Sequence, residues 1–444
     1  MFTRFAPSPT GLIHIGNVRS AILNWAFAKK NNGKFILRID DTDNERSKKK
    51  YEDLIKNNLH WLGLDWDITF NQSSRHNLYE EKIKILKDSK RLYPCFETPE
   101  ELSLKKKSLL SSGKPPIYDR SSLNLTAKEI KQKISEGIKP HWRFKLEDKI
   151  IKWNDLLKGE VSFDSKKLSD PVLIRENGSL LYHLPSVIDD ISENITDIIR
   201  GEDHLSNTAY HIQIFEALNS NIPNFAHHPF LTDEQGKGFS KRIGSLSIES
   251  LKDEDFESIT ILNYLINIGS SNDLVAEKNI ENLIKNFSLK NISSASPKFS
   301  KEVLTNLNKN TLKNFNVHEV SSRISVLDKK LSQEMLWKFS KNNINFFSEI
   351  KFFIDIIKSK NNIVNNNINS DFLDVAIETL PSEPYDEETW EKWTNLINEK
   401  TNLKGKELYL PLRIALTGQD KGPEMKYLLP LLNKQNILEK FGKI

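Results

Sequence analysis

The feature that most constrains the fold is a strand–loop–helix–strand unit predicted in the first forty residues. A short segment with β-type residues, 2–5, precedes a loop, and residues 18–26 then repeat apolar side chains at helical spacing. Asn31-Asn32-Gly33 ends this helix, and residues 35–39 read as a second, buried strand. The loop of such a unit lies at the carboxyl edge of a parallel sheet, where α/β proteins bind nucleotides.

The composition of the loop, residues 6–17, suits an anionic ligand. Gly11 and Gly16 allow a phosphate or a base to approach the backbone closely, and Pro7 stiffens the entry to the loop. A helix that starts near Asn17 directs unpaired N–H groups and the positive end of its dipole toward the loop. We therefore predict a nucleotide site here.

Two common nucleotide-binding motifs are excluded. Gly11 and Gly16 have the spacing of a P-loop, but Asn17 follows where that motif has its phosphate-binding lysine. The dinucleotide fingerprint fails at residues 236–241, because this segment ends in lysine rather than glycine. What remains is the tetrapeptide His14-Ile15-Gly16-Asn17 and a distant Ser240-Lys241 pair.

At these residues the chain resembles the class I aminoacyl-tRNA synthetases, and among them the bacterial glutamyl-tRNA synthetases. His14-Ile15-Gly16-Asn17 matches the HIGH motif, with Asn17 in place of its second histidine. The segment from Gly238 to Arg242 matches the KMSKS loop, although Gly238 stands where that motif has its first lysine. Five further blocks follow in the order of that family, at residues 3–11, 38–43, 181–190, 200–204 and 411–418.

The resemblance implies that the protein activates an amino acid with ATP, and the charges that this reaction develops indicate which side chains assist it. Joining the α-carboxylate of an amino acid to the α-phosphorus of ATP builds negative charge on phosphate oxygens, which cations and N–H donors stabilise. His14 and Lys241 are the predicted catalytic donors, Ser240 adds a hydrogen bond, and Mg²⁺ on the pyrophosphate adds charge. An assisting role for Lys237 in binding the phosphates stays open. The predicted ATP-binding residues are Ala6, Pro7, Ser8, Gly11, His14, Gly16, Asn17, Ser240, Lys241 and Arg242.

The predicted amino-acid substrate carries a planar carboxylate on its side chain. Arg4 and Arg200 can make forked, charge-assisted bonds to such a group, and Asp40 can hold the α-ammonium. Glutamine would leave a buried arginine poorly paired, at a cost of about 2–3 kcal/mol. The resemblance completes the glutamate-binding set as Arg4, Ala6, Ser8, Asp40, Tyr182 and Arg200. Outside such motif blocks, the two arginines would be read as surface ion-pair residues.

The net charge and the cysteine count indicate which partners and which metal sites are to be expected. The formal net charge of the 444-residue chain is only +4, so a tRNA surface must come from local basic patches. No leader peptide or long apolar run is apparent, which favours a cytoplasmic protein without membrane contact. Some family members bind zinc in the insertion through several Cys and His side chains. Cys95 is the single cysteine, so we predict no zinc and no metal ligand from the protein.

The predicted fold class is α/β: a split Rossmann-type, doubly wound parallel sheet with an inserted α+β module, followed by an all-α anticodon-binding region. Residues 1–94 and 183–235 form the two halves of the catalytic domain, and residues 95–182 form the inserted module, which grips the acceptor end of tRNA in the family. Residues 236–315 hold the KMSKS loop and a helical stem-contact domain, and residues 316–444 form the anticodon-binding domain.

The predicted function is that of a glutamate–tRNA ligase. It forms glutamyl-adenylate from ATP and L-glutamate and transfers glutamate to the 3′-terminal ribose of tRNA(Glu); tRNA(Gln), as a second or replacement acceptor, stays open. The family default is a monomer, and the expected tRNA contacts are Asp41, Asp43 and Arg413. The altered Ser-Lys loop motivates an alternative from another class, a catalytically weakened, synthetase-like tRNA-binding protein.

Overall fold

The computed structural model describes residues 1–43, 45–238, 246–360 and 368–443. The chain divides into two compact units. The first unit comprises Met1–Lys252, Ile261–Leu274 and Asn279–Ser300, and the second comprises Asp253–Thr260, Val275–Lys278 and Lys301–Ile444. No helix in the described ranges is both long and apolar enough to span a bilayer.

A parallel sheet forms the centre of the first unit. Strand β1 (Phe2–Phe5) pairs with β2 (Lys34–Ile39), which pairs with β3 (Ile68–Asn71); β9 (Asp197–Gly201) pairs with β10 (Asn224–His228). β1 and β9 adjoin, and the Thr196 N–H donates to the Phe2 carbonyl at 3.0 Å. The order is therefore β3-β2-β1-β9-β10, which confirms the predicted doubly wound sheet. Its switch point lies between β1 and β9, where such sheets bind ligands.

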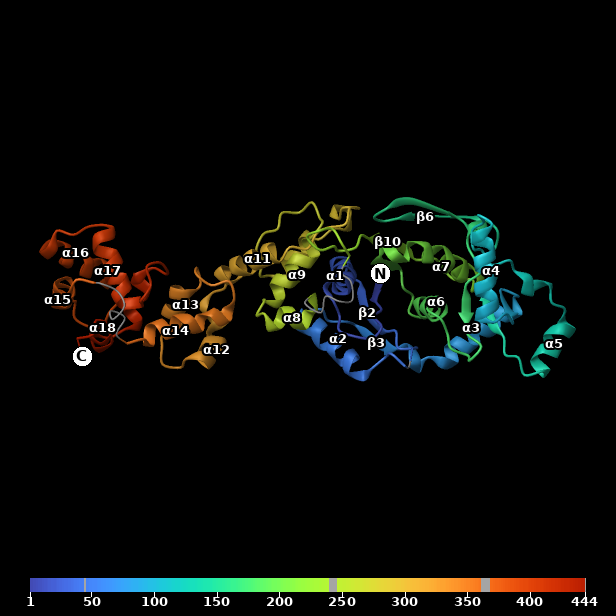
Figure 1. Ribbon diagram of the computed structural model, residues 1–444, viewed down its shortest axis with the longest axis horizontal. Helices are drawn as coiled ribbons and strands as arrows, with labels where there is room; N and C mark the ends of the chain where they lie inside the picture. The colour runs from blue at the N-terminus through green and yellow to red at the C-terminus, as the bar shows by residue number, and fades with distance from the viewer. Residues whose placement is uncertain (44, 239–245, 361–367, 444) are drawn as a thin grey trace. The chain divides into compact units, whose positions relative to one another are not determined.

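Helices connect the parallel strands and cover the sheet (Figure 1). The helix predicted after the first loop is α1 (Ile15–Lys30), and a glycine after it is required because a Cβ at Gly33 would lie 2.6 Å from the Met1 carbonyl oxygen. The helices of this layer are α1, α2 (Lys49–Trp61), α3 (His76–Asp88), α6 (His183–Ser192) and α7 (Leu205–Ala217).

The inserted module has the predicted α+β character. An antiparallel sheet joins β4 (Leu92–Cys95), β5 (His141–Phe144) and β8 (Val172–Ile174), and a separate hairpin joins β6 (Ile150–Asp155) to β7 (Gly159–Asp164). Helices α4 (Pro99–Ser111) and α5 (Ala127–Ser135) lie between β4 and β5 along the chain (Figure 1 labels both helices). β6 packs against β10 of the central sheet, so the hairpin contacts the second half of the catalytic fold.

Three short helices follow the catalytic sheet along the chain. They are α8 (Ile248–Asp253), α9 (Ser258–Asn267) and α10 (Ile280–Asn286). Gly269 lies two residues after the end of α9 and has a positive φ of 72°. At this position a side chain would be strained and would also meet Pro297, so glycine is needed.

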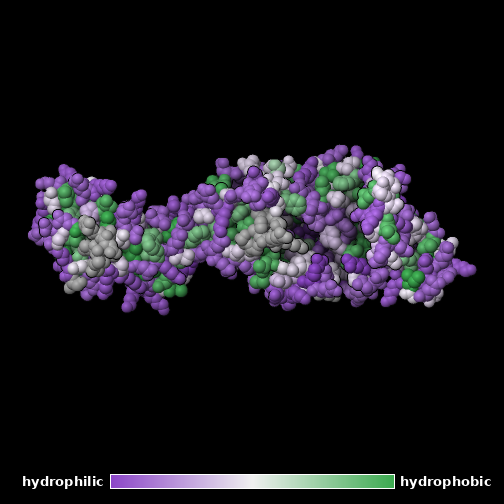
Figure 2. Space-filling view, viewed as in Figure 1, coloured by the Kyte–Doolittle hydropathy of each residue, from purple (hydrophilic) through white to green (hydrophobic). Residues whose placement is uncertain are grey.

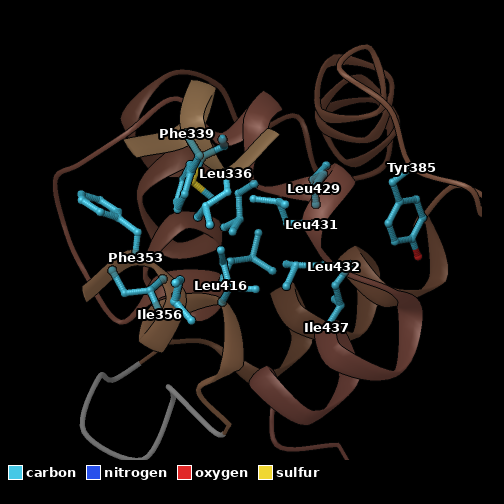
Figure 3. Close-up of a cluster of buried hydrophobic side chains, with 14 of the residues drawn as sticks. Leu336, Phe339, Phe353, Ile356, Tyr385, Leu416, Leu429, Leu431, Leu432 and Ile437 are labelled. Atoms are coloured by element: carbon cyan, nitrogen blue, oxygen red, sulfur yellow. The ribbon is translucent and has the colours of Figure 1, made fainter. Parts of the chain in front are cut away.

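The described residues of the second unit contain helices and no strands. Apolar side chains from helices throughout the unit fill its core, and Figure 3 shows Leu336, Phe339 and Leu416 pointing into it. An all-α region was predicted here from the lack of strand alternation. The helices are α11 (Lys301–Asn314), α12 (Val317–Leu327), α13 (Gln333–Ser340), α14 (Ile350–Lys358), α15 (Ser370–Glu378), α16 (Thr389–Thr401), α17 (Lys406–Thr417) and α18 (Lys434–Lys440).

Candidate active site

Two adjoining cavities lie at the carboxyl ends of the parallel strands. Their volumes are about 560 and 710 Å³. Figure 2 shows the surface of the first unit hollowed, with hydrophilic residues around the hollow. The described residues predicted to bind ATP or glutamate all line one or both cavities: Arg4, Ala6, Pro7, Ser8, Gly11, His14, Gly16, Asn17, Asp40, Tyr182 and Arg200. Segments up to about 200 residues apart in the chain thus meet in one place.

His14 occupies the N-cap position of α1. Its Nδ1 accepts a hydrogen bond from the Gly16 N–H at 3.2 Å, which leaves Nε2 free to face the cavity as a donor. A Cβ at Gly16 would lie 3.1 Å from two atoms of this imidazole, so glycine lets the ring rest over the helix end. The surrounding protein atoms lower the pKa of His14 although the ring is exposed to the cavity. The first turn of α1 adds N–H donors beside this imidazole.

The predicted Ser240, Lys241 and Arg242 lie outside the described residues. The described residues on either side of this segment border the cavities. Gly238 lines the first cavity, and Ser247 lines the second and forms a β-bridge with His14.

Arg4 and Asp40 belong to a buried network of four charged side chains. Asp190 of α6 accepts from Arg4 Nε at 3.1 Å and from Arg38 Nη1 at 3.0 Å. Arg38 also forms a forked pair with Asp40, at 2.6 and 3.1 Å. Burial raises the pKa of Asp40, and the charge of Arg38 opposes this. Asp189 also lies 3.9 Å from Arg38 Nε. Arg4 and Asp40 thus carry partners that the sequence interpretation had not assigned.

Arg200 differs from Arg4 because it has no carboxylate partner among the described residues. Its side chain is 6% exposed, and its N–H groups meet neutral acceptors. Nη2 donates to Thr208 Oγ1 at 2.7 Å, Nη1 donates to the Tyr182 hydroxyl at 3.2 Å, and Nε donates to His227 Nε2 at 3.2 Å. Burial lowers the pKa of Arg200, but a guanidinium remains charged near neutral pH. Arg200 therefore presents to the cavity a preformed cation that no described carboxylate contacts.

His204 is neither a fully buried core histidine nor a freely exposed one. Its side chain is 33% exposed and lines both cavities, with its ring centroid 5.3 Å from that of Tyr182. Burial lowers its pKa to about 4. A neutral imidazole at this place can contact a ligand without repelling Arg200.

The three residues predicted to contact tRNA have different surroundings. Asp41 accepts from the N–H and the hydroxyl of Ser73, at 2.9 and 2.7 Å, and Asp43 pairs with Arg46. Arg413, in the second unit, lines a cavity of about 300 Å³. Its Nη1 is buried and has no hydrogen-bond partner among the described residues. Burial lowers the pKa of Arg413, and nothing among those residues neutralises its charge.

Sequence reasoning missed residues at the end of β10 and directly after it. The missed residues lining the first cavity include His228, Phe230, Leu231 and Thr232. His228 ends β10 in register with Gly201 at the end of β9. Recognising residues 224–228 as a parallel strand would have placed the residues that follow at the same edge.

Cys95 is fully buried, as expected of a small apolar side chain. Donor atoms of Cys95, Glu97 and His141 lie within 4.8 Å of one another. Burial raises the pKa of the Cys95 thiol, which disfavours the thiolate that metals bind. A structural zinc site takes four ligands, so the absence of zinc stays our prediction.

His228 makes the stability of the first unit depend on pH. Its Nε2 lies 2.8 Å from Ser20 Oγ, and burial lowers its pKa from 6.5 to about 3. The unfolded chain takes up this proton near pH 6.5 and the folded chain only near pH 3, so stability falls as the pH drops below 6.5. By pH 5 the loss is about 2 kcal/mol. We expect His228→Gln to remove that share of the decrease between pH 7 and pH 5 in urea unfolding; an unchanged decrease would contradict this.

Comparisons with known proteins agree with this fold and site. A family model described as "tRNA synthetases class I (E and Q), catalytic domain" matches residues 1–306, and an "Anticodon binding domain" model matches residues 340–443. The fold and the site thus define a class I tRNA synthetase.

The similar proteins narrow this class. Glutamate–tRNA ligase 2 of Rickettsia canadensis is 46% identical over 441 residues, covering 99% of each chain. Glutamate–tRNA ligase 1 of Rickettsia prowazekii is 46% identical over 445 residues, covering 100% of this chain and 99% of its own. The crystal structure of a glutamate tRNA ligase from Elizabethkingia meningosepticum in complex with its amino acid is 25% identical, with a TM-score of 0.88 over 100% of this chain and 98% of that one. This chain belongs to the glutamate–tRNA ligase family.

Proposed function

We propose that the chain is a glutamate–tRNA ligase, which activates L-glutamate with ATP and transfers it to the 3′-terminal ribose of tRNA(Glu). The observation that carries this proposal is Arg200, a buried guanidinium that lines the same cavity as His14 and has no carboxylate partner among the described residues. An amino acid with a side-chain carboxylate supplies the missing charge. The full-length match to glutamate–tRNA ligases does not favour the alternative of a catalytically weakened tRNA-binding protein.

The ATP end of the site is assigned to the start of α1 and the segment after Gly238. His14 Nε2 and the N–H groups of the first turn donate to phosphate oxygens and stabilise the charge that grows there during adenylate formation. Lys241 supplies an ammonium and Ser240 a hydroxyl, as the motif predicts. Mg²⁺, carried on the phosphates of ATP, adds positive charge, and we assign it no protein ligand.

The amino-acid end of the site is assigned to the strands on either side of the switch point. Arg200 binds the side-chain carboxylate of glutamate, with Tyr182 beside it. Arg4 retains N–H groups beyond those that pair with Asp190, and these reach the same carboxylate. Asp40 and the backbone of Ala6 and Ser8 hold the end of glutamate that carries the α-ammonium group, next to the ATP cavity.

The second step is attack by the tRNA ribose hydroxyl on the adenylate, in which positioning supplies much of the rate. Arg413 is the proposed contact in the second unit, because a half-buried guanidinium whose Nη1 has no hydrogen-bond partner among the described residues suits a base edge or a phosphate. Charging assays with purified tRNA(Glu) and tRNA(Gln) decide which tRNA the chain accepts. A monomer is our proposal for its oligomeric state.

The activity is tested by ATP–pyrophosphate exchange with glutamate in the presence of cognate tRNA. The wild-type chain should exchange, and Lys241→Ala should reduce exchange by about 100-fold or more, since one preorganised charge donor is lost. Binding of tRNA by the variant should persist. An intact, folded chain that shows no exchange with either tRNA would overturn the proposed function.

A further inference from the structure

A chain of hydrogen bonds leads from Arg200 into the inserted module. Arg200 Nε donates to His227 Nε2 at 3.2 Å, and His227 Nδ1 lies 2.5 Å from Asp155 Oδ2. His227, on β10, is fully buried, and Asp155, at the end of β6, is 2% exposed. Three buried side chains from β9, β10 and the β6–β7 hairpin are thus joined in sequence.

The carboxylate decides which imidazole nitrogen carries the proton. An ionised Asp155 accepts from Nδ1–H of His227, so in the neutral ring Nε2 carries a lone pair. Burial lowers the pKa of His227 and keeps the ring neutral near pH 7. The lone pair faces the Nε–H of Arg200, and the Thr208 hydroxyl lies 3.0 Å from the same nitrogen. Of the two neutral tautomers of His227, only this one offers an acceptor to the Nε–H of Arg200.

The hairpin holds Asp155 firmly. Asp155 Oδ1 accepts from the backbone N–H groups of Leu157, Lys158 and His227, at 3.0, 3.0 and 3.1 Å. The Leu156 N–H donates to the Phe225 carbonyl of β10 at 2.8 Å. Lys158 at the hairpin turn pairs with Glu202, two residues after Arg200, at 2.6 Å. The turn therefore contacts both the strand that carries His227 and the segment that follows Arg200.

We propose that Asp155 and His227 are positioning residues that orient the guanidinium of Arg200 toward the side-chain carboxylate of glutamate. The β6–β7 hairpin of the inserted module is then a structural part of the amino-acid site. This inference rests on the proposed function, since it assigns Arg200 to the substrate carboxylate. The inference concerns the orientation of the Arg200 guanidinium. A guanidinium that is rotated away from the carboxylate cannot form the forked pair of hydrogen bonds.

Asp155→Asn is the sharpest test, because it changes hydrogen-bond polarity and preserves shape. The amide donates to His227 Nδ1 and moves the proton to Nε2, which then opposes the Nε–H of Arg200. In tRNA-dependent pyrophosphate exchange we expect KM for glutamate to rise roughly 10- to 100-fold, with KM for ATP within about twofold of wild type. Asp164→Asn is the matched control: Asp164 ends β7 of the same hairpin and accepts only from the Lys166 N–H in the described contacts, so wild-type constants are expected.

A second variant keeps the test decisive if Asp155→Asn does not fold. His227→Asn retains an amide that can donate to Asp155, but it is too short to accept from Arg200, and we expect a similar rise in KM for glutamate alone. A folded variant with unchanged KM for glutamate, or with equal changes in both KM values, overturns the positioning role. An inactive wild-type chain would instead overturn the proposed function, so the two failures are distinguishable.

Discussion

Replacing Arg200 by methionine is expected to lower kcat/KM for glutamate by about 1,000-fold, or about 4 kcal/mol, in tRNA-dependent pyrophosphate exchange. The guanidinium is buried and lacks a carboxylate among the described residues, so the substrate supplies the charge that pairs with it. Without Arg200, the carboxylate of glutamate would enter a dry site unpaired, which costs more than the loss of an exposed ion pair.

Although Arg200→Met should lower activity, we do not expect it to lower the stability of the folded protein. Removing a buried cation without a counter-charge relieves a desolvation penalty, so the unfolding temperature of Arg200→Met without ligand should be unchanged or higher. Arg200→Lys serves as the matched comparison, because it keeps the charge and loses the fork, and its kcat/KM should lie between those of methionine and wild type. A methionine variant that binds glutamate normally would show that Arg200 is structural.

Replacing Asp190 by alanine is expected to destabilise the first unit by about 3–5 kcal/mol, because two buried arginines lose their shared carboxylate. Asp190 is 1% exposed and bonds both Arg4 and Arg38. Calorimetry should show the transition that glutamate and ATP stabilise falling by about 10 °C. The control is Asp65→Ala, whose carboxylate is 77% exposed and pairs only with His60 in the described contacts, so about 0.5 kcal/mol or less is expected. Equal shifts for the two variants would contradict the buried network.

Much of the fold was predictable because local signals are strong in this chain. The apolar spacing of residues 18–26 and the stop at Asn31-Asn32-Gly33 place α1 correctly. The buried strand at residues 35–39 is β2, and the lack of strand alternation after residue 316 matches the all-α second unit. Periodicity and turn residues act over a few positions, so the sequence alone carries them.

The sequence by itself determined which chemistry-bearing residues this protein has and in what order they occur: Arg4, the His14 motif, Arg200 and the Lys241 motif. Only the tertiary structure decided how their charges pair. Asp190 balances Arg4 and Arg38, whereas Arg200 is surrounded by neutral acceptors and is held through His227 by Asp155 of the inserted hairpin. The reason is physical, because the energy of a buried charge depends on what lies within a few ångströms, and residues that distant in the chain become neighbours only when the strands assemble.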